Sequence, residues 1–111
     1  MQRIVLVPVD ADESAHAAGQ LILDLLVDSA TSRSSGPFPA FGRKGDFRQP
    51  ATVYPFTLMV DGRLDFGAFA PDEARLDVLA VRQALLATGE EIACSGPAGI
   101  SRYRIVSADR L

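Results

Sequence analysis

The chain has 111 residues, of which 48% are hydrophobic, and eleven Lys and Arg against fourteen Asp and Glu give a formal net charge of −3. This length predicts one domain, residues 1–111, which buries enough surface to fold without a metal or a disulfide. The single cysteine excludes an internal disulfide framework and a four-cysteine zinc site, and no apolar run is long enough to span a membrane. We therefore expect a cytoplasmic domain with no cofactor and no membrane partner.

The chain begins with an apolar segment that predicts a central β-strand. Residues 4–7 are consecutively apolar and mostly β-branched, which is typical of a strand covered on both faces. Acidic residues follow, and either Asp10 or Asp12 could cap a helix, with Glu13 in its first turn. Apolar residues then recur at helical spacing, so we predict an amphipathic helix from about residue 12 to residue 29.

Residues 31–50 interrupt these patterns. They contain three Gly, three Pro and four Ser or Thr, which are the residues that most often break regular structure. The segment predicts a long irregular loop, and loops of this length in small domains often carry function.

A hairpin is predicted over residues 52–69, with two competing registers. A two-residue turn at Asp61 and Gly62 would place Val60 opposite Arg63, whereas a type I turn with Gly62 in the left-handed conformation pairs Met59 with Arg63. The second register collects the apolar side chains on one face and the polar ones on the other, so we prefer it.

The last forty residues predict a helix and a second hairpin. Pro71 and two acidic residues are typical of a helix start, and Gly89 is typical of a helix end. Residues 90–108 then predict two strands, and placing Ser95 opposite Ile100 brings Glu91 opposite Arg104. In that register Cys94 lies on the inward, apolar face, where a thiol is usually unreactive.

The predicted order is β-α-β-β-α-β-β. It indicates an α+β fold: a two-layer sandwich in which both helices pack on one face of a mixed sheet that contains two hairpins.

The run Leu6-Val7-Pro8-Val9-Asp10 resembles the opening of universal stress proteins, in which the aspartate lies beside a bound nucleotide. The resemblance implies a nucleotide- or anion-binding domain. Gly96 and Gly99 match the first half of that family's late glycine motif, but Asp109 and Arg110 stand where Gly and Ser or Thr would close the phosphate cradle. We therefore expect ATP to bind weakly or not at all.

The long loop combines cations with aromatic rings, as protein contact surfaces often do. We predict a contact surface made of Arg33, Phe38, Phe41, Arg43, Lys44, Phe47 and Arg48. The alternative is that the phenylalanines anchor the loop on the sheet while the cations remain solvated. An alternative site for an anion consists of Asp10, Arg102 and Arg104.

These patterns favour a small binding or regulatory module that acts through protein–protein contact. We predict no catalytic residue. His16 is expected on a helix surface, which offers no cleft by itself, and Cys94 has no second cysteine or nearby histidine in the sequence to activate it. Basic residues concentrated in a loop argue against binding to duplex nucleic acid. Self-association through an open sheet edge is a further expectation.

Overall fold

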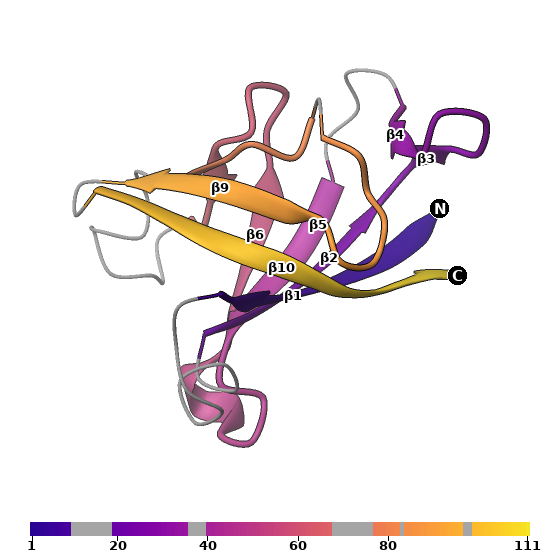
Figure 1. Cartoon of the computed structure of the whole chain (residues 1–111). Coiled ribbons are helices and arrows are strands. Elements are labelled where there is room, and N and C mark those ends of the chain that lie inside the picture. Colours follow the sequence, from indigo (N-terminus) through magenta and orange to yellow (C-terminus); the bar gives the residue numbers. More distant parts are fainter. Residues whose placement is uncertain (10–18, 36–39, 68–76, 83, 97–98) are drawn as a thin grey trace.

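The structure is a computed structural model that describes residues 1–9, 19–35, 40–67, 77–82, 84–96 and 99–111. These residues form an eight-stranded antiparallel sheet, a separate two-stranded sheet and one 3₁₀ turn (Figure 1). No α-helix and no parallel strand pair occurs among them, so the predicted α+β sandwich with a mixed sheet is wrong. The elements are β1 (Gln2–Pro8), β2 (Gln20–Leu25), β3 (Val27–Asp28), β4 (Arg33–Ser34), β5 (Ala40–Gly45), η1 (Pro50–Thr52), β6 (Tyr54–Leu58), β7 (Leu64–Asp65), β8 (Val78–Leu79), β9 (Glu91–Gly96) and β10 (Gly99–Arg110).

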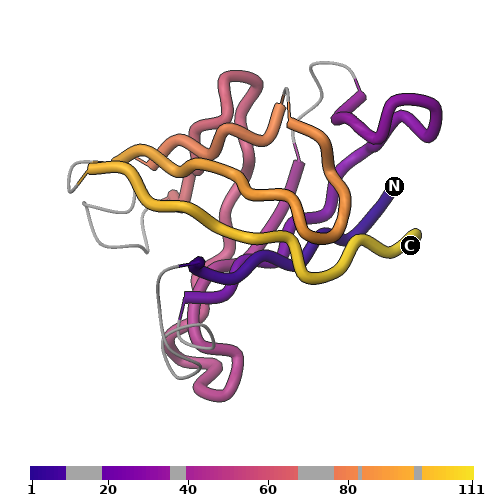
Figure 2. Tube along the Cα trace, in the orientation of Figure 1, coloured from indigo at the N-terminus to yellow at the C-terminus, as the bar shows by residue number. Residues whose placement is uncertain are grey.

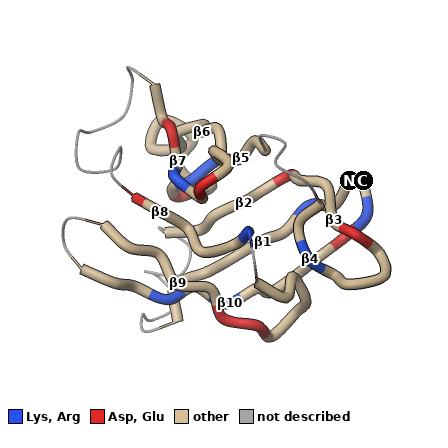
Figure 3. The backbone as a smooth tube through the Cα atoms, turned by 90° about the horizontal axis from the view of Figure 1, so that it is seen from above, with Lys and Arg blue, Asp and Glu red and all other residues tan. Residues whose placement is uncertain are grey.

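The large sheet curls into a nearly closed barrel. Its strand order is β7-β6-β5-β2-β1-β10-β9-β8, and the two terminal strands meet each other (Figure 3). Arg63 forms a bridge with Val78, and the Leu64 N–H donates to the Asp77 carbonyl at 2.9 Å. The expected open edge is therefore occupied at this seam, where the barrel satisfies its own backbone groups.

The core fills the inside of the barrel with the alternate residues of each strand. Ile4 and Leu6 of β1 are fully buried, and β2 contributes every second residue in the same way. Other buried residues between β5 and β10 belong to the same core: Ala40, Phe56, Leu58, Leu64, Phe66, Leu79, Val81, Leu86, Ile92, Cys94, Tyr103 and Ile105. Burial with a period of two is what a sheet with one face toward a core requires.

The central position of the first strand is confirmed, because β1 lies between β2 and β10. Its predicted burial on both faces is wrong: Val5 and Val7 are half-buried on the outer face, while Ile4 is fully buried. Where β1 pairs with β10, the register shifts between Val5 and Leu6, so one extra residue of β10 forms a bulge.

The helix predicted for residues 12–29 is wrong wherever the structure describes it. Residues 20–25 form β2, in which Leu21 and Leu23 face the core. The outward Asp24 lies opposite Arg3 of β1 and accepts two hydrogen bonds from its guanidinium, at 2.8 and 2.9 Å. A short apolar run fits both periods, and pairing with β1 decides in favour of the strand.

The second predicted helix is also wrong over its described part. Residues 78–79 form β8, and residues 80–82 and 84–89 contain turns and irregular structure but no helix. Leu79, Val81 and Leu86 are buried there, and the Leu86 N–H donates to the Ser32 carbonyl at 2.8 Å. The segment therefore buries its apolar side chains through these contacts with the barrel and not through the apolar face of a helix.

Both hairpin registers are confirmed. The Met59 N–H donates to the Arg63 carbonyl at 2.9 Å, and Gly62 has a φ of 90°. In the second hairpin Ser95 pairs with Ile100.

The two ends of the chain lie side by side in the barrel (Figure 2), where the Leu111 N–H donates to the Met1 carbonyl at 3.0 Å.

Candidate binding surface

The predicted irregular loop of residues 31–50 contains a strand of the barrel, β5, and this is a correction of the sequence analysis. β5 pairs with β2 on one side and β6 on the other. Its glycines permit close approach rather than turns. A Cβ at Gly42 would lie 2.5 Å from both the Ile22 carbonyl oxygen and the Phe56 ring. A glycine in a strand often marks such an approach.

Pairing in the sheet divides the predicted contact residues between two sides of β5. Phe41 and Arg43 lie on the outer side, and 64% of Phe41 is exposed. The Arg43 guanidinium lies 5.8 Å from the centre of the Phe47 ring, within the range of a cation–π contact. Three of the predicted residues thus remain together on one surface.

An open groove of about 340 Å³ lies beside Phe41. Phe56 and Phe66 lie at its base, with their ring centres 5.4 Å apart and the rings tilted by 59°. We name this surface the Phe41 face, which comprises Arg43, Phe47 and the residues that line the groove: Phe41, Pro55, Phe56, Thr57, Asp65, Phe66 and Gly67. Its β6 and β7 residues were not predicted from the sequence, because residues 31–50 were expected to form a loop separate from the hairpin.

Asp65 brings a negative charge to the Phe41 face. It lies opposite Thr57 on β6, and its Oδ1 accepts a hydrogen bond from the Gly67 N–H at 2.9 Å. That bond fixes the chain at the end of β7 and leaves the exposed carboxylate on the outer side. The face therefore carries one anion as well as the Arg43 cation.

Lys44 does not belong to this surface, because it points into the barrel. Its Nζ lies 3.4 Å from Oδ2 of Asp77 and 6.0 Å from the centre of the Tyr103 ring. Asp77 in turn fits against Gly96, where a Cβ would lie 2.4 Å from its Oδ1. We call Lys44, Asp77, Cys94 and Tyr103 the inner polar cluster.

The pKa values within the inner polar cluster disfavour nucleophilic chemistry. Burial raises the pKa of the Cys94 thiol to about 11, so the thiol stays protonated at neutral pH. Burial is the largest single effect on Lys44 and disfavours its charged amine, yet the pKa of Lys44 lies above the ordinary value because Tyr103, Asp77 and Cys94 together favour the charged form. The predicted inward position of Cys94 is confirmed.

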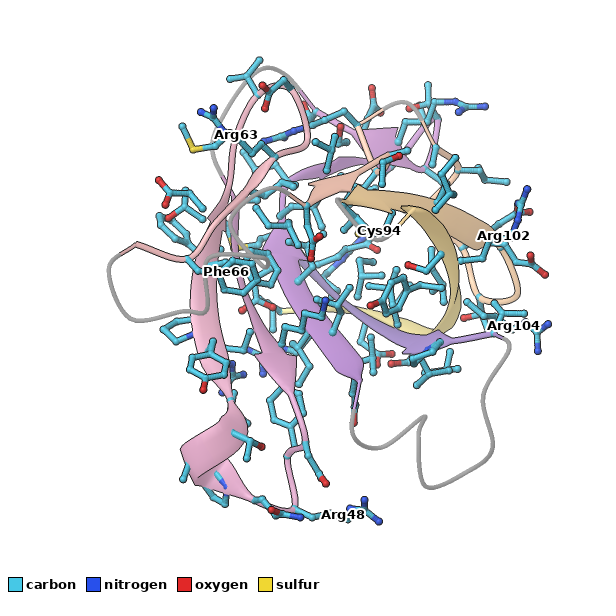
Figure 4. All side chains as sticks on the ribbon, turned by 90° about the vertical axis from the view of Figure 1, so that its left-hand side faces the viewer. Arg48, Arg63, Phe66, Cys94, Arg102 and Arg104 are labelled. Carbon is cyan, nitrogen blue, oxygen red and sulfur yellow. The ribbon has the colours of Figure 1, made fainter. Side chains whose placement is uncertain are left out.

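Arg48 has a local partner. Its guanidinium donates to both carboxylate oxygens of Asp46 at 3.0 Å, and its backbone N–H also donates to Oδ1. The side-chain hydrogen bond from Arg48 is the main reason that the pKa of Asp46 lies below its ordinary value. This pair stabilises the turn that follows β5, and Arg48 lies far from Phe66 of the groove (Figure 4).

The remaining predicted residues are not gathered at one place. Arg33 lies in β4 of the separate two-stranded sheet, and Phe38 and Asp10 lie outside the described residues. Arg102 and Arg104 extend outward from β10 (Figure 4), and Arg104 forms the predicted ion pair with Glu91 at 3.5 Å.

The described residues contain no group of three His, Cys, Asp or Glu side chains that could hold a metal ion. Nor does any helix in these parts of the chain have the length and apolar character needed to cross a membrane.

Comparisons with protein-family models, with curated proteins and with solved structures found no match to this chain. The described strands are antiparallel throughout, whereas the doubly wound sheets that bind nucleotides are mostly parallel, so the resemblance to universal stress proteins does not extend to the sheet. Gly96 and Gly99 end β9 and begin β10, and these two strands form a hairpin rather than a loop that opens a helix.

Proposed function

We propose that the chain is a binding module that acts through protein–protein contact, with the Phe41 face as its contact surface. The observation that carries the proposal is an exposed aromatic side chain beside an open, mostly apolar groove. Aromatic and arginine side chains are enriched in interfaces, and a large apolar side chain in a groove excludes water from its neighbours.

The barrel supports this role because it holds the surface rigidly. β5 and β6 are paired along their length, and the Phe56 and Phe66 rings beneath the groove belong to the core. Binding at such a surface orders few additional side chains, so little affinity is lost to conformational entropy. Basic and acidic residues are interspersed over the described strands (Figure 3). Of the contact residues predicted from the sequence, the proposal retains Phe41, Arg43 and Phe47. The cytoplasmic location remains a prediction from the sequence.

Photo-crosslinking tests the proposal. A photo-crosslinking amino acid at Thr57, within the face, should form covalent adducts with protein in cells that express the full chain. Phe41→Ser should reduce those adducts at least tenfold, since an exposed interface anchor contributes about 2 kcal/mol or more. Ile100→Ser, at a residue of β10 that is 75% exposed, is the matched control and should leave them unchanged.

Two results would contradict the proposal. One is an equal yield of adducts when the crosslinker is placed at Val106, on the outer side of β10. The other is an unchanged yield at Thr57 after Phe41→Ser. Either result would show that the Phe41 face is not a specific contact surface.

A further inference from the structure

The strand register fixes how the outward residues of the Phe41 face are arranged. Phe41, Thr57 and Asp65 form one row across β5, β6 and β7. Arg43 lies opposite Pro55 in the next outward row. Neighbouring strands are about 4.8 Å apart and every second residue advances about 6.8 Å, so Arg43 and Asp65 occupy opposite corners of a rectangle of roughly 10 by 7 Å.

The charges at these corners are complementary to those of a second copy. In a two-fold interface, residue i contacts residue j of the other copy, and residue j contacts residue i. A two-fold axis that lies in the face, perpendicular to the diagonal from Arg43 to Asp65, places each Arg43 opposite the other copy's Asp65. Both ion pairs form together because the symmetry generates the second from the first.

The same axis brings the aromatic anchors together. It crosses the first row between Phe41 and Thr57, and it passes about 2 Å from the position of Phe41 in the idealised sheet. The two Phe41 side chains therefore meet beside the axis, over the two grooves. This arrangement removes the most exposed aromatic ring of the described residues from water in both copies.

We infer that the partner of the Phe41 face is a second copy of this chain, an inference that rests on the proposed function. A strongly acidic partner would be repelled by Asp65, and a strongly basic partner would be repelled by Arg43. A second copy in the two-fold arrangement pairs each of these two residues with the opposite charge. The outside of a barrel is convex and the face is small, so we expect a weak dimer that forms at roughly 0.1–1 mM chain.

Sedimentation velocity over a range of roughly 10 μM to 1 mM chain tests this inference. The unaltered chain should associate as the concentration rises, and Phe41→Ser should weaken association at least tenfold, whereas Ile100→Ser should not. Arg43→Asp and Asp65→Arg should each weaken it at least tenfold, because each places two like-charged pairs in the dimer. An equimolar mixture of these two variants restores both pairs and should associate again.

A chain that stays monomeric over this range would overturn the inference, as would a mixture that associates no better than each variant alone. If Asp65→Arg does not fold, Asp65→Asn keeps an oxygen for the Gly67 N–H and should weaken association without reversing the charge. A monomeric chain that still crosslinks other proteins from Thr57, dependent on Phe41, would refute only the second copy. Loss of both signals would refute the proposed function too.

Discussion

On β5, Gly42 and Lys44 face the inside of the barrel, while Phe41 and Arg43 face outward. Inside the barrel, Gly42 is constrained by backbone and ring atoms of the two neighbouring strands. On the outer side, Phe41 is largely exposed and Arg43 contacts the Phe47 ring. Residues one position apart therefore differ in their surroundings. The inner side of β5 packs against the neighbouring strands, and its outer side is available for contact with a partner.

The same difference separates two ion pairs. Lys44 and Asp77 form the inner pair, which is longer but more buried, with side-chain exposures of 28% and 16%. Arg3 and Asp24 form the outer pair, which has two short hydrogen bonds, yet its arginine is 42% exposed. Solvent weakens the outer pair, so good geometry alone does not make it the more stabilising one.

The largest effect is expected at Gly42. Gly42→Val places side-chain atoms where the Ile22 carbonyl and the Phe56 ring already lie, and overpacking of this kind should lower the free energy of unfolding by about 3 kcal/mol or more. Gly42→Ala should cost less, about 1–3 kcal/mol. Urea denaturation measures both. A Gly42→Ala variant as stable as the parent chain would contradict the packing of β5 against β6.

Breaking the inner ion pair should have the next largest effect. Lys44→Met leaves the Asp77 carboxylate without its cation in a partly buried site, which should cost about 1–3 kcal/mol. Asp77→Leu added to that variant removes the unpaired charge and should restore part of the loss. A double-mutant cycle measures the coupling between the two side chains. Additive effects of the two substitutions would show that the pair contributes nothing beyond its separate parts.

Alkaline pH should weaken the inner polar cluster. The folded protein holds the pKa values of Lys44, Cys94 and Tyr103 above their ordinary values, mainly through burial for the thiol and the phenol. The unfolded chain therefore releases these protons at lower pH. Their stabilising contribution is complete below about pH 8 and is lost as the pH rises through the folded values, with an effect of up to about 3 kcal/mol for the thiol.

Denaturation measured between about pH 8 and pH 11 checks this expectation. Cys94→Ala should make the decline of stability shallower, because its thiol, with a pKa of about 11, no longer titrates. A thiol that reacts with Ellman's reagent at pH 8 as fast as a free cysteine would contradict its burial.

The sequence predicted both hairpins well because their registers depend on local information. Turn chemistry at Gly62 and the alternation of apolar residues around Ser95 and Ile100 suffice to choose the pairing. The sequence also indicated which side of each hairpin is buried. These two hairpins supply β6, β7, β9 and β10 of the barrel.

The helices and the long loop could not be predicted correctly, because pairing between distant segments decides them. The run from Gln20 to Leu25 fits a helix and a strand equally, and only Arg3 on β1 reveals that Asp24 faces outward. The glycines of β5 indicate a loop until Phe56 is known to lie beside Gly42. The candidate site was found in part for the same reason: Phe41, Arg43 and Phe47 were identified, but Asp65, two strands away from β5 across the sheet, was not.

The outer ion pair should contribute less than the inner one. The hydrogen bonds from Arg3 are the main cause that lowers the pKa of Asp24, so its contribution is present above about pH 4 and disappears as the pH falls through the folded value. Asp24→Asn should lower the free energy of unfolding by about 0.2–1 kcal/mol at neutral pH, and by nothing at an acidic pH where Asp24 is protonated in the folded protein. Thermal denaturation of both chains across acidic pH tests this. A difference that persists when Asp24 is protonated would point to packing rather than charge.

The smallest effect on stability should come from Phe41, although it is the residue on which the proposed function depends. Its ring is largely exposed and lies outside the core, so Phe41→Ser should change the free energy of unfolding by no more than about 0.5 kcal/mol. The sequence alternative, in which this ring anchors a loop, predicts a loss of about 3–5 kcal/mol instead. Urea denaturation of Phe41→Ser and of the buried control Phe56→Leu, in dilute solution where the chain is monomeric, separates the two. A large loss at Phe41 would place it with the inner residues of β5 and remove the reason to regard the outer side as a contact surface.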